Sequence, residues 1–233
     1  MHYLIMKRAK KTRQAPGRPV ASPNRDTRAM LLSAATELFG ERGVAATTFA
    51  NIAERAGLTP AMLHYHFKDR DQLLDAVVEE RLAPLVAYVW DPVRPGDQPA
   101  DIVRGVVGRM LDRIELMPWV PPTWMREVLN EGGLLRSRLL GRLPIEKIHA
   151  LAHAIAQGQS RDELNRDVDP LLAVFSVLGM VMMLSSTVNF WAETFRRERP
   201  SREVLQRHIT GLLLDGLCHS GTGPTTPMHR KSS

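Results

Sequence analysis

The sequence predicts an all-α fold: an N-terminal three-helix helix-turn-helix unit followed by a larger C-terminal helical part, about nine helices in all. Apolar residues recur at the spacing of amphipathic helices, and no segment has the alternating pattern of a strand. Glycine and proline residues divide the chain at intervals that suit helices. The 233 residues are 44% hydrophobic and 24% charged, which is enough for a sizeable core in one large or two small domains.

The expected helices follow one another along the chain. They span residues 25–42, 48–56, 60–66, 70–90, 99–116, 121–131, 134–157, 170–192 and 201–218. Gly43 ends the first helix and Pro92 follows the fourth, because neither residue favours continuation. Gly141 or Pro144 can interrupt the seventh helix, and Ser201 is a suitable N-cap for the last.

Residues 48–67, which read TFANIAERAGLTPAMLHYHF, form the segment around which the rest of the chain is organised. Thr48 and Thr59 are expected N-caps of two short helices, and Pro60 suits the first position of the second. Between them, Gly57 can adopt the positive φ that a tight turn requires. Two helices joined in this way indicate a helix-turn-helix, whose second helix enters the major groove of DNA.

A longer motif surrounds this segment, from about Arg28 to Leu74. Its residues are Leu31-Leu32-x-Ala34-Ala35-x-x-Leu38-Phe39, Gly43, Thr47-Thr48, Ile52-Ala53, Ala56-Gly57 and Leu63-His64-Tyr65-His66-Phe67-Lys68. In these residues and spacings the sequence resembles the TetR family of bacterial transcriptional regulators. It departs from the family at His64, where tyrosine is usual, so an imidazole replaces a hydroxyl that contacts phosphate.

The resemblance implies that residues 25–70 are a DNA-binding domain. By position in the motif, Phe49, Thr59, Pro60, Ala61 and Tyr65 are expected to face bases, and Thr48, His64, Lys68 and Arg70 to face phosphates. Few of these side chains can form bidentate contacts with a base. Much of the specificity is therefore expected from a homodimer on a palindromic double-stranded DNA operator, with half-sites about one helical turn apart.

Positive charge is concentrated near the N-terminus. Residues 1–70 contain 12 Lys and Arg against 5 Asp and Glu, a formal +7, whereas the remainder carries −1. This distribution suits phosphate binding. Residues 1–24 include six Lys and Arg, three prolines and no acid, and indicate a flexible basic arm, either a solvated tail or a segment that follows DNA. Residues 219–233 are expected to be a disordered tail.

The resemblance also implies a small-molecule pocket and a dimer interface within residues 71–218. The candidate pocket residues are Met110, Trp119, Trp124, Met125, Phe175, Met180, Met183 and Phe190, with Arg126, Glu127 and Asn130 the polar groups nearest to them in sequence. Methionine and tryptophan adapt to apolar ligands. Taken singly, each residue is better explained as core, so the prediction of a largely apolar effector depends on the resemblance.

Residues 170–192 carry no charge and are long enough to span a membrane. Serine, threonine and asparagine residues interrupt the apolar run, and arginines follow it. We therefore interpret this segment as a core helix buried on several faces, with no membrane partner. In the family, the last two helices pack against their copies, which implies a homodimer through residues of about 168–197 and 201–218.

The sequence predicts neither an enzyme nor a cofactor site, because nucleophile, phosphate-loop and dinucleotide motifs are absent. His149 and His153 lie four residues apart but lack a third ligand, so they are interpreted as a surface or packed pair and not a metal site. The predicted function is a cytoplasmic, DNA-binding repressor, released when a ligand displaces the helix at 70–90. The alternatives left open are an activator of the same fold, a sequence-independent DNA binder using the basic arm, and a small-molecule-processing enzyme with an incidental DNA-binding unit.

Overall fold

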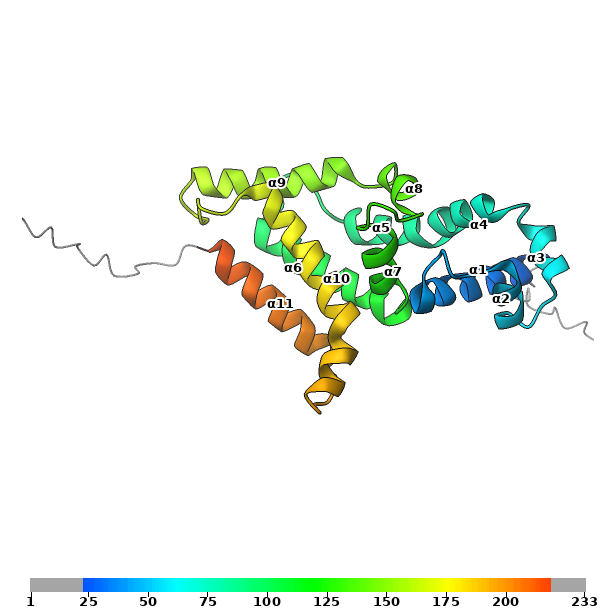
Figure 1. Cartoon of the computed structure of the whole chain (residues 1–233). Helices are drawn as coiled ribbons and strands as arrows, with labels where there is room; N and C mark the ends of the chain where they lie inside the picture. The colour runs from blue at the N-terminus through cyan, green and yellow to red at the C-terminus, as the bar shows by residue number, and fades with distance from the viewer. Residues whose placement is uncertain (1–22, 219–233) are drawn as a thin grey trace, which may run out of the picture.

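The computed structural model describes residues 23–218, and the expectations for the basic arm and the C-terminal tail lie outside these residues except at positions 23 and 24. The predicted all-α class is confirmed. Within the described range there are eleven α-helices and one π-helical turn, and no strand beyond an isolated bridge between Leu164 and Cys218. Figure 1 shows an elongated arrangement, with α1 to α3 at one end and α9 to α11 toward the other.

The N-terminal head comprises α1 (Pro23–Arg42), α2 (Phe49–Arg55) and α3 (Pro60–His66). The predicted caps are present. Thr48 and Asn51 form a reciprocal capping box, each backbone N–H donating to the other's side chain at 3.2 Å. Thr59 accepts the N–H of Met62 at 3.4 Å, and Gly57 has a φ of 67° between the helices. The turn therefore forms as the sequence indicates.

The expected helix at 70–90 is a composite of three segments: α4 (Arg70–Val77), the π-helical turn η1 (Val78–Leu82) and α5 (Ala83–Trp90). Pro84 lies inside this composite helix. A proline in a helix interior cannot donate to the preceding turn and its ring crowds the carbonyl four residues earlier. A π-helical turn just before it, in which the N–H of Ala83 reaches the carbonyl of Val78, accommodates the proline.

Four further helices build the middle of the molecule: α6 (Pro99–Leu116), α7 (Val120–Glu127), α8 (Arg136–Leu140) and α9 (Ile145–Ser160). The expected helix at 134–157 is interrupted between Gly141 and Pro144, as those residues indicated. The expected helix at 121–131 ends at Glu127. The chain then folds back so closely that a Cβ on Gly133 would lie 2.2 Å from the Glu127 carbonyl oxygen, a position that only glycine can occupy.

The last two helices are α10 (Pro170–Thr194) and α11 (Arg202–Leu217). α10 satisfies length and composition criteria for a membrane span, with a mean hydropathy of 2.2, but only 33% of its most apolar window is buried. The expectation that α10 is buried on several faces is wrong for a single chain, because α6, α7, α9 and α11 cover only part of its circumference. Its exposed large apolar side chains are Leu171, Leu172, Phe175, Met183, Phe190 and Trp191.

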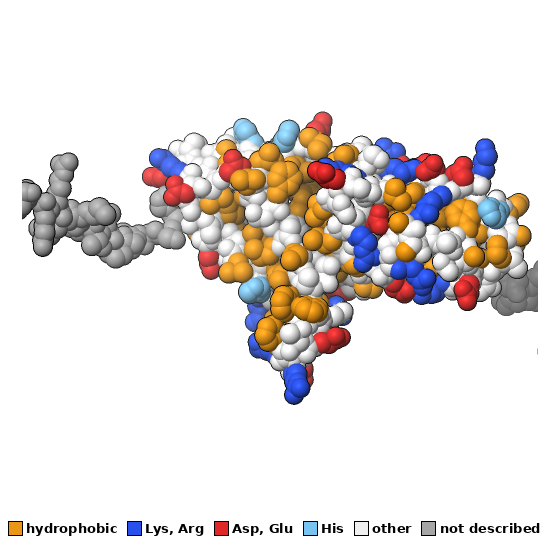
Figure 2. Space-filling model, in the orientation of Figure 1, with side chains coloured by type: hydrophobic (Ala, Val, Ile, Leu, Met, Phe, Trp, Pro, Cys, Tyr) orange, Lys and Arg blue, Asp and Glu red, His pale blue; other side chains and the backbone are white. Residues whose placement is uncertain are grey.

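At the projecting end of α10, three aromatic rings form a cluster. The centroids of Phe190 and Trp191 are 4.9 Å apart, and Trp191 stacks on Phe195 at 5.6 Å. All three side chains are exposed. Figure 2 shows hydrophobic side chains continuing over this face of the molecule toward that end.

A single hydrophobic core connects the head to the rest of the chain. Buried residues of α1, such as Leu38 and Phe39, belong to the same cluster as Leu74 of α4 and Val120 of α7. α1 contacts both α4 and α7. The expected domain boundary near residue 70 thus falls within continuous packing, so a movement in the larger part can reach the head.

Candidate DNA-binding surface and ligand cavity

The exposed face of α3 carries the predicted base-facing residues. Thr59, Pro60, Ala61 and Tyr65 are all exposed, and the Tyr65 side chain has 72% of its surface accessible. Ala61 and Tyr65 are four positions apart, so they lie on the same side of the helix. The opposite side places Leu63 in the core with no exposed surface. α3 is therefore anchored by one face and presents the other to solvent.

Four predicted phosphate-facing residues gather around one hollow of about 360 Å³ where α2, α3 and α4 meet. Thr48, His64, Lys68 and Arg70 line it together with the half-buried Phe49. The rings of Phe49 and His64 pack with centroids 5.2 Å apart. Phe49, predicted to face a base, thus supports the His64 imidazole at this hollow.

Two of these side chains are already engaged within the head. The Thr48 hydroxyl lies 2.8 Å from the Asn51 side-chain oxygen, to which it donates. A hydroxyl has a single proton, so a phosphate contact from Thr48 would require this capping box to open. Arg70 donates one N–H to the backbone carbonyl of Val44, which leaves its other N–H groups for a phosphate.

The end of α3 is held by Arg28 of α1. The Arg28 guanidinium donates to the backbone carbonyl of His66 at 3.3 Å, lies 4.5 Å from the centre of the Phe67 ring and pairs with Glu80 of η1. Among residues 23–218, the buried Nε2 atom of His66 has no hydrogen-bond partner. Burial, reinforced by the positive charge of Arg28, lowers the pKa of His66 below its ordinary value. The recognition helix therefore ends in an imidazole that resists protonation.

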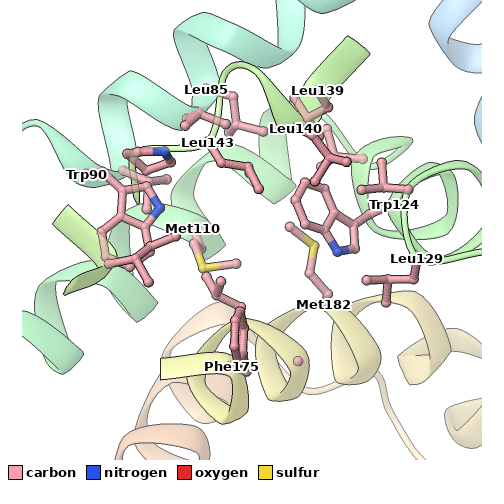
Figure 3. Close-up of a pocket in the computed structure, with 18 of the residues that line it drawn as sticks. Leu85, Trp90, Met110, Trp124, Leu129, Leu139, Leu140, Leu143, Phe175 and Met182 are labelled. Atoms are coloured by element: carbon pink, nitrogen blue, oxygen red, sulfur yellow. The ribbon is translucent and has the colours of Figure 1, made fainter. Parts of the chain in front are cut away.

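A cavity of about 470 Å³ lies between α5, α6, α7, α8, α9 and α10. This volume is within the range of small-molecule sites. Figure 3 shows its side chains converging from these helices. Apolar residues dominate, including Leu85, Trp90, Met110, Trp124, Leu129, Leu139, Leu140, Leu143, Phe175 and Met182.

Only some of the predicted pocket residues line the cavity. Met110, Trp124 and Phe175 line it, whereas Trp119, Met125, Met180, Met183 and Phe190 do not. For the residues of α10, the rotation of the helix about its axis decides which side chains face the cavity. Positions 175, 178, 179 and 182 form the cavity-facing stripe, so Met182 and not Met183 faces the space, and the Met183 and Phe190 side chains are exposed instead.

The polar groups named from sequence also take other positions. Arg126 and Glu127 turn toward the head, and the Asn130 side chain accepts the N–H of Gly132 at 3.4 Å. The charged residue at the cavity is instead Arg136 of α8. Sequence reasoning missed it because α8 is short and its orientation depends on the loop before it. Between residues 23 and 218, no group of three or more His, Cys, Asp or Glu is placed to hold a metal ion.

α7 joins the cavity to the head. Val120, Trp124 and Val128 line the cavity, while the buried Glu127 carboxylate accepts the N–H of Val44 at 2.8 Å and that of Leu134 at 3.2 Å. Val44 belongs to the loop between α1 and α2.

The start of α7 also packs against α1. Trp119 packs closely against Gly40, where an added Cβ would lie 2.8 Å from the Trp119 Cβ. Arg126 donates to the carbonyl of Phe39 at 3.3 Å. The contact between the two helices is therefore close packing at the start of α7, reinforced by hydrogen bonds toward its end.

Comparisons with known proteins agree with this architecture. Residues 31–77 match the family described as "Bacterial regulatory proteins, tetR family". The chain is 28% identical to SrpR, an HTH-type transcriptional regulator of Pseudomonas putida, over 69% of this chain and 75% of SrpR. Identity to TtgR, a second HTH-type regulator of Pseudomonas putida, is 43%, but over 54 residues that make up only 23% of this chain and 26% of TtgR.

Among solved structures, the fold is similar to that of KstR2, a ketosteroid transcriptional regulator of Mycobacterium tuberculosis. The TM-score is 0.65 at 21% identity, over 86% of this chain and 97% of KstR2. The similarity at this identity concerns the fold, whereas the family model matches residues 31–77, which carry the helix-turn-helix. Residues 31–77 are therefore a DNA-binding domain of the TetR family, and the relatives that the chain matches are transcriptional regulators and not enzymes.

Proposed function

We propose that this chain is a cytoplasmic repressor that binds a palindromic operator as a homodimer and is released by a small, largely apolar ligand. Residues 25–70 would form its DNA-binding unit and residues 71–218 its ligand-binding and dimerisation unit. The observation that supports this proposal best is α7, because one short helix contacts both the cavity and the loop that precedes α2.

On this proposal seven of the nine residues predicted to contact DNA keep their roles, whereas the roles of Phe49 and Thr48 change. Thr59, Pro60, Ala61 and Tyr65 would face bases from the exposed side of α3. His64, Lys68 and Arg70 would bind phosphate at the hollow beside α4, with Phe49 supporting the imidazole. Thr48 acts mainly as the cap of α2, because its hydroxyl is engaged with Asn51.

The exposed apolar faces of α10 and α11 support the homodimer. Large apolar side chains are uncovered along both helices, among them Met183 of α10 and Leu212 of α11, with more than half of each side chain accessible. Contiguous exposed apolar surface of this kind marks an interaction site in a soluble protein. A second copy would cover it with the matching face, as an isologous interface requires.

Release by ligand requires that the two states of the protein bind the ligand with different affinities. A ligand between α5, α7 and α10 would press on Trp124 of α7 and on Leu85 and Trp90 of α5. α7 would transmit the change through Glu127 to the loop before α2, and α5 through η1 to α4. This extends the route expected from sequence, which involved the helix at 70–90 alone.

Selection of bound duplexes from a random DNA library tests the proposal. An enriched inverted repeat, bound by two copies of the chain and released by a cavity ligand, is the expected result. Equal competition by random and selected duplexes would favour a sequence-independent DNA binder instead. Transcription in a reconstituted system with the selected site distinguishes a repressor from an activator, because only the repressor lowers transcript levels when bound.

A further inference from the structure

The cavity contains one charged side chain among its twenty lining residues, and that side chain has no partner. Arg136 is half-buried, and within residues 23–218 its guanidinium makes no hydrogen bond or ion pair. The neighbouring arginines differ. Arg138 pairs with Asp71 and Asp75, and Arg142 pairs with Glu79. An unpaired guanidinium beside an apolar space is therefore a specific feature of this position.

The other polar side-chain groups of the lining are also hydrogen-bond donors. They are the indole N–H groups of Trp90 and Trp124, neither of which has a partner in the described part of the chain. Figure 3 shows the Trp90 nitrogen on the side of the ring that faces the cavity. Arginine and indole groups have no acceptor. No aspartate or glutamate of the described residues lines the space. The lining thus complements a ligand with acceptors and negative charge.

We infer that the effector is an amphipathic anion, whose apolar body fills the cavity and whose carboxylate, or a like acid group, binds the Arg136 guanidinium. The inference deepens the proposed function and depends on the cavity being the effector site. Arginine binds carboxylate through two parallel N–H donors, and the bond is strengthened where apolar walls exclude water. Cationic compounds of the same shape are rejected, because they would bring like charge beside Arg136.

The position of Arg136 also connects such an anion to the head. Arg136 and Arg138 are two residues apart on α8, so their side chains point to nearly opposite sides of the helix, about 160° apart. One faces the cavity, and the other binds Asp71 and Asp75 of α4 at 2.6 and 2.7 Å. A ligand held by Arg136 therefore acts on the same five-residue helix that is ion-paired to α4.

Two fluorescent probes that share one apolar body test the inference on the full-length chain. 8-Anilino-1-naphthalenesulfonate carries an acid group, and N-phenyl-1-naphthylamine is the same body without it. Titrations follow the wild type, Arg136→Gln, Arg136→Lys and the control Arg104→Gln, which removes an exposed arginine of α6 that pairs only with Asp101 in the described range. Circular dichroism verifies that each variant is folded.

We expect Arg136→Gln to weaken binding of the sulfonate at least about tenfold and binding of the neutral probe by less than about twofold. Arg136→Lys should retain part of the sulfonate affinity, and Arg104→Gln should leave both affinities unchanged. Equal loss for both probes in Arg136→Gln, or no loss for either, would overturn the inference.

A cavity-filling variant separates this outcome from failure of the proposed function. Gly179 lines the cavity, and a Cβ there meets no atom within 4 Å, so Gly179→Leu places a side chain in open space at the site. Loss of both probes in this variant shows that they bind in the cavity. If the neutral probe still binds with wild-type affinity, the cavity is not its site, and the proposed ligand response fails independently of Arg136.

Discussion

Replacing Glu127 should loosen the contact between α7 and the head. This carboxylate is 5% exposed and accepts one N–H from the loop between α1 and α2 and another from the loop between α7 and α8. Glu127→Ala leaves both donors, those of Val44 and Leu134, without a partner. Glu127→Gln keeps one acceptor oxygen but places an NH₂ group against the second donor.

The magnitude follows from these two bonds. A hydrogen bond to a charged group contributes about 1.5–3 kcal/mol, so two contribute about 3–6 kcal/mol. Removing the carboxylate also removes the unfavourable desolvation of a buried charge, which offsets part of the loss. We therefore expect Glu127→Ala to lower the free energy of unfolding by about 2–4 kcal/mol and Glu127→Gln by about 1–2 kcal/mol. For a chain of this size the alanine variant should melt about 10 °C lower.

Thermal and urea unfolding, followed by circular dichroism at one fixed chain concentration, measure both effects, because the stability of a dimer depends on concentration. Glu131→Gln is the matched control, since it makes the same change four residues away at an exposed position. If all three variants unfold within about 0.5 kcal/mol of the wild type, the ordinary range for surface substitutions, the role assigned to Glu127 is refuted.

Three further outcomes are expected. Because the pKa of His66 is lowered in the folded state, protonation favours unfolding, so stability should fall as pH drops below about 6.5 and level off below the lowered pKa. His66→Gln should flatten this pH dependence in melting curves recorded between about pH 5 and 8. Leu212→Glu should weaken dimerisation at least about tenfold in sedimentation equilibrium, and an unchanged dimer would exclude α11 from the interface. Lys68→Gln should reduce the slope of log affinity for DNA against log salt by about one, whereas an unchanged slope would exclude a phosphate contact.

Local chemistry explains why the helices could be predicted from sequence. The Thr48 and Thr59 caps, the positive φ of Gly57 and the break between Gly141 and Pro144 depend on residues within a few positions of one another. The same locality identifies the family motif. The π-helical turn is also local, and the position of Pro84 could have indicated it.

The lining of the cavity could not be predicted in the same way. Choosing between Met182 and Met183 requires the rotation of α10 about its axis, which is set by packing against α6, α7 and α9. Glu127 and Arg136 illustrate the same limit. In sequence Glu127 is among the polar groups nearest to the pocket tryptophans, but in the structure it contacts the head, and Arg136 lies at the cavity instead.

The aromatic cluster at the end of α10 has a consequence for the abundance of the protein. On the proposed dimer, a newly made chain would carry Phe190, Trp191 and Phe195 uncovered until it meets a second copy. Meeting is a second-order process, so the waiting time lengthens as fewer chains are present. During that time the lone chain is the form most open to proteolysis and aggregation. If the chain dimerises as proposed, a cell that makes little of it would degrade a larger fraction of the chains before they pair. Occupancy of the operator would then rise only when the rate of synthesis exceeds a threshold.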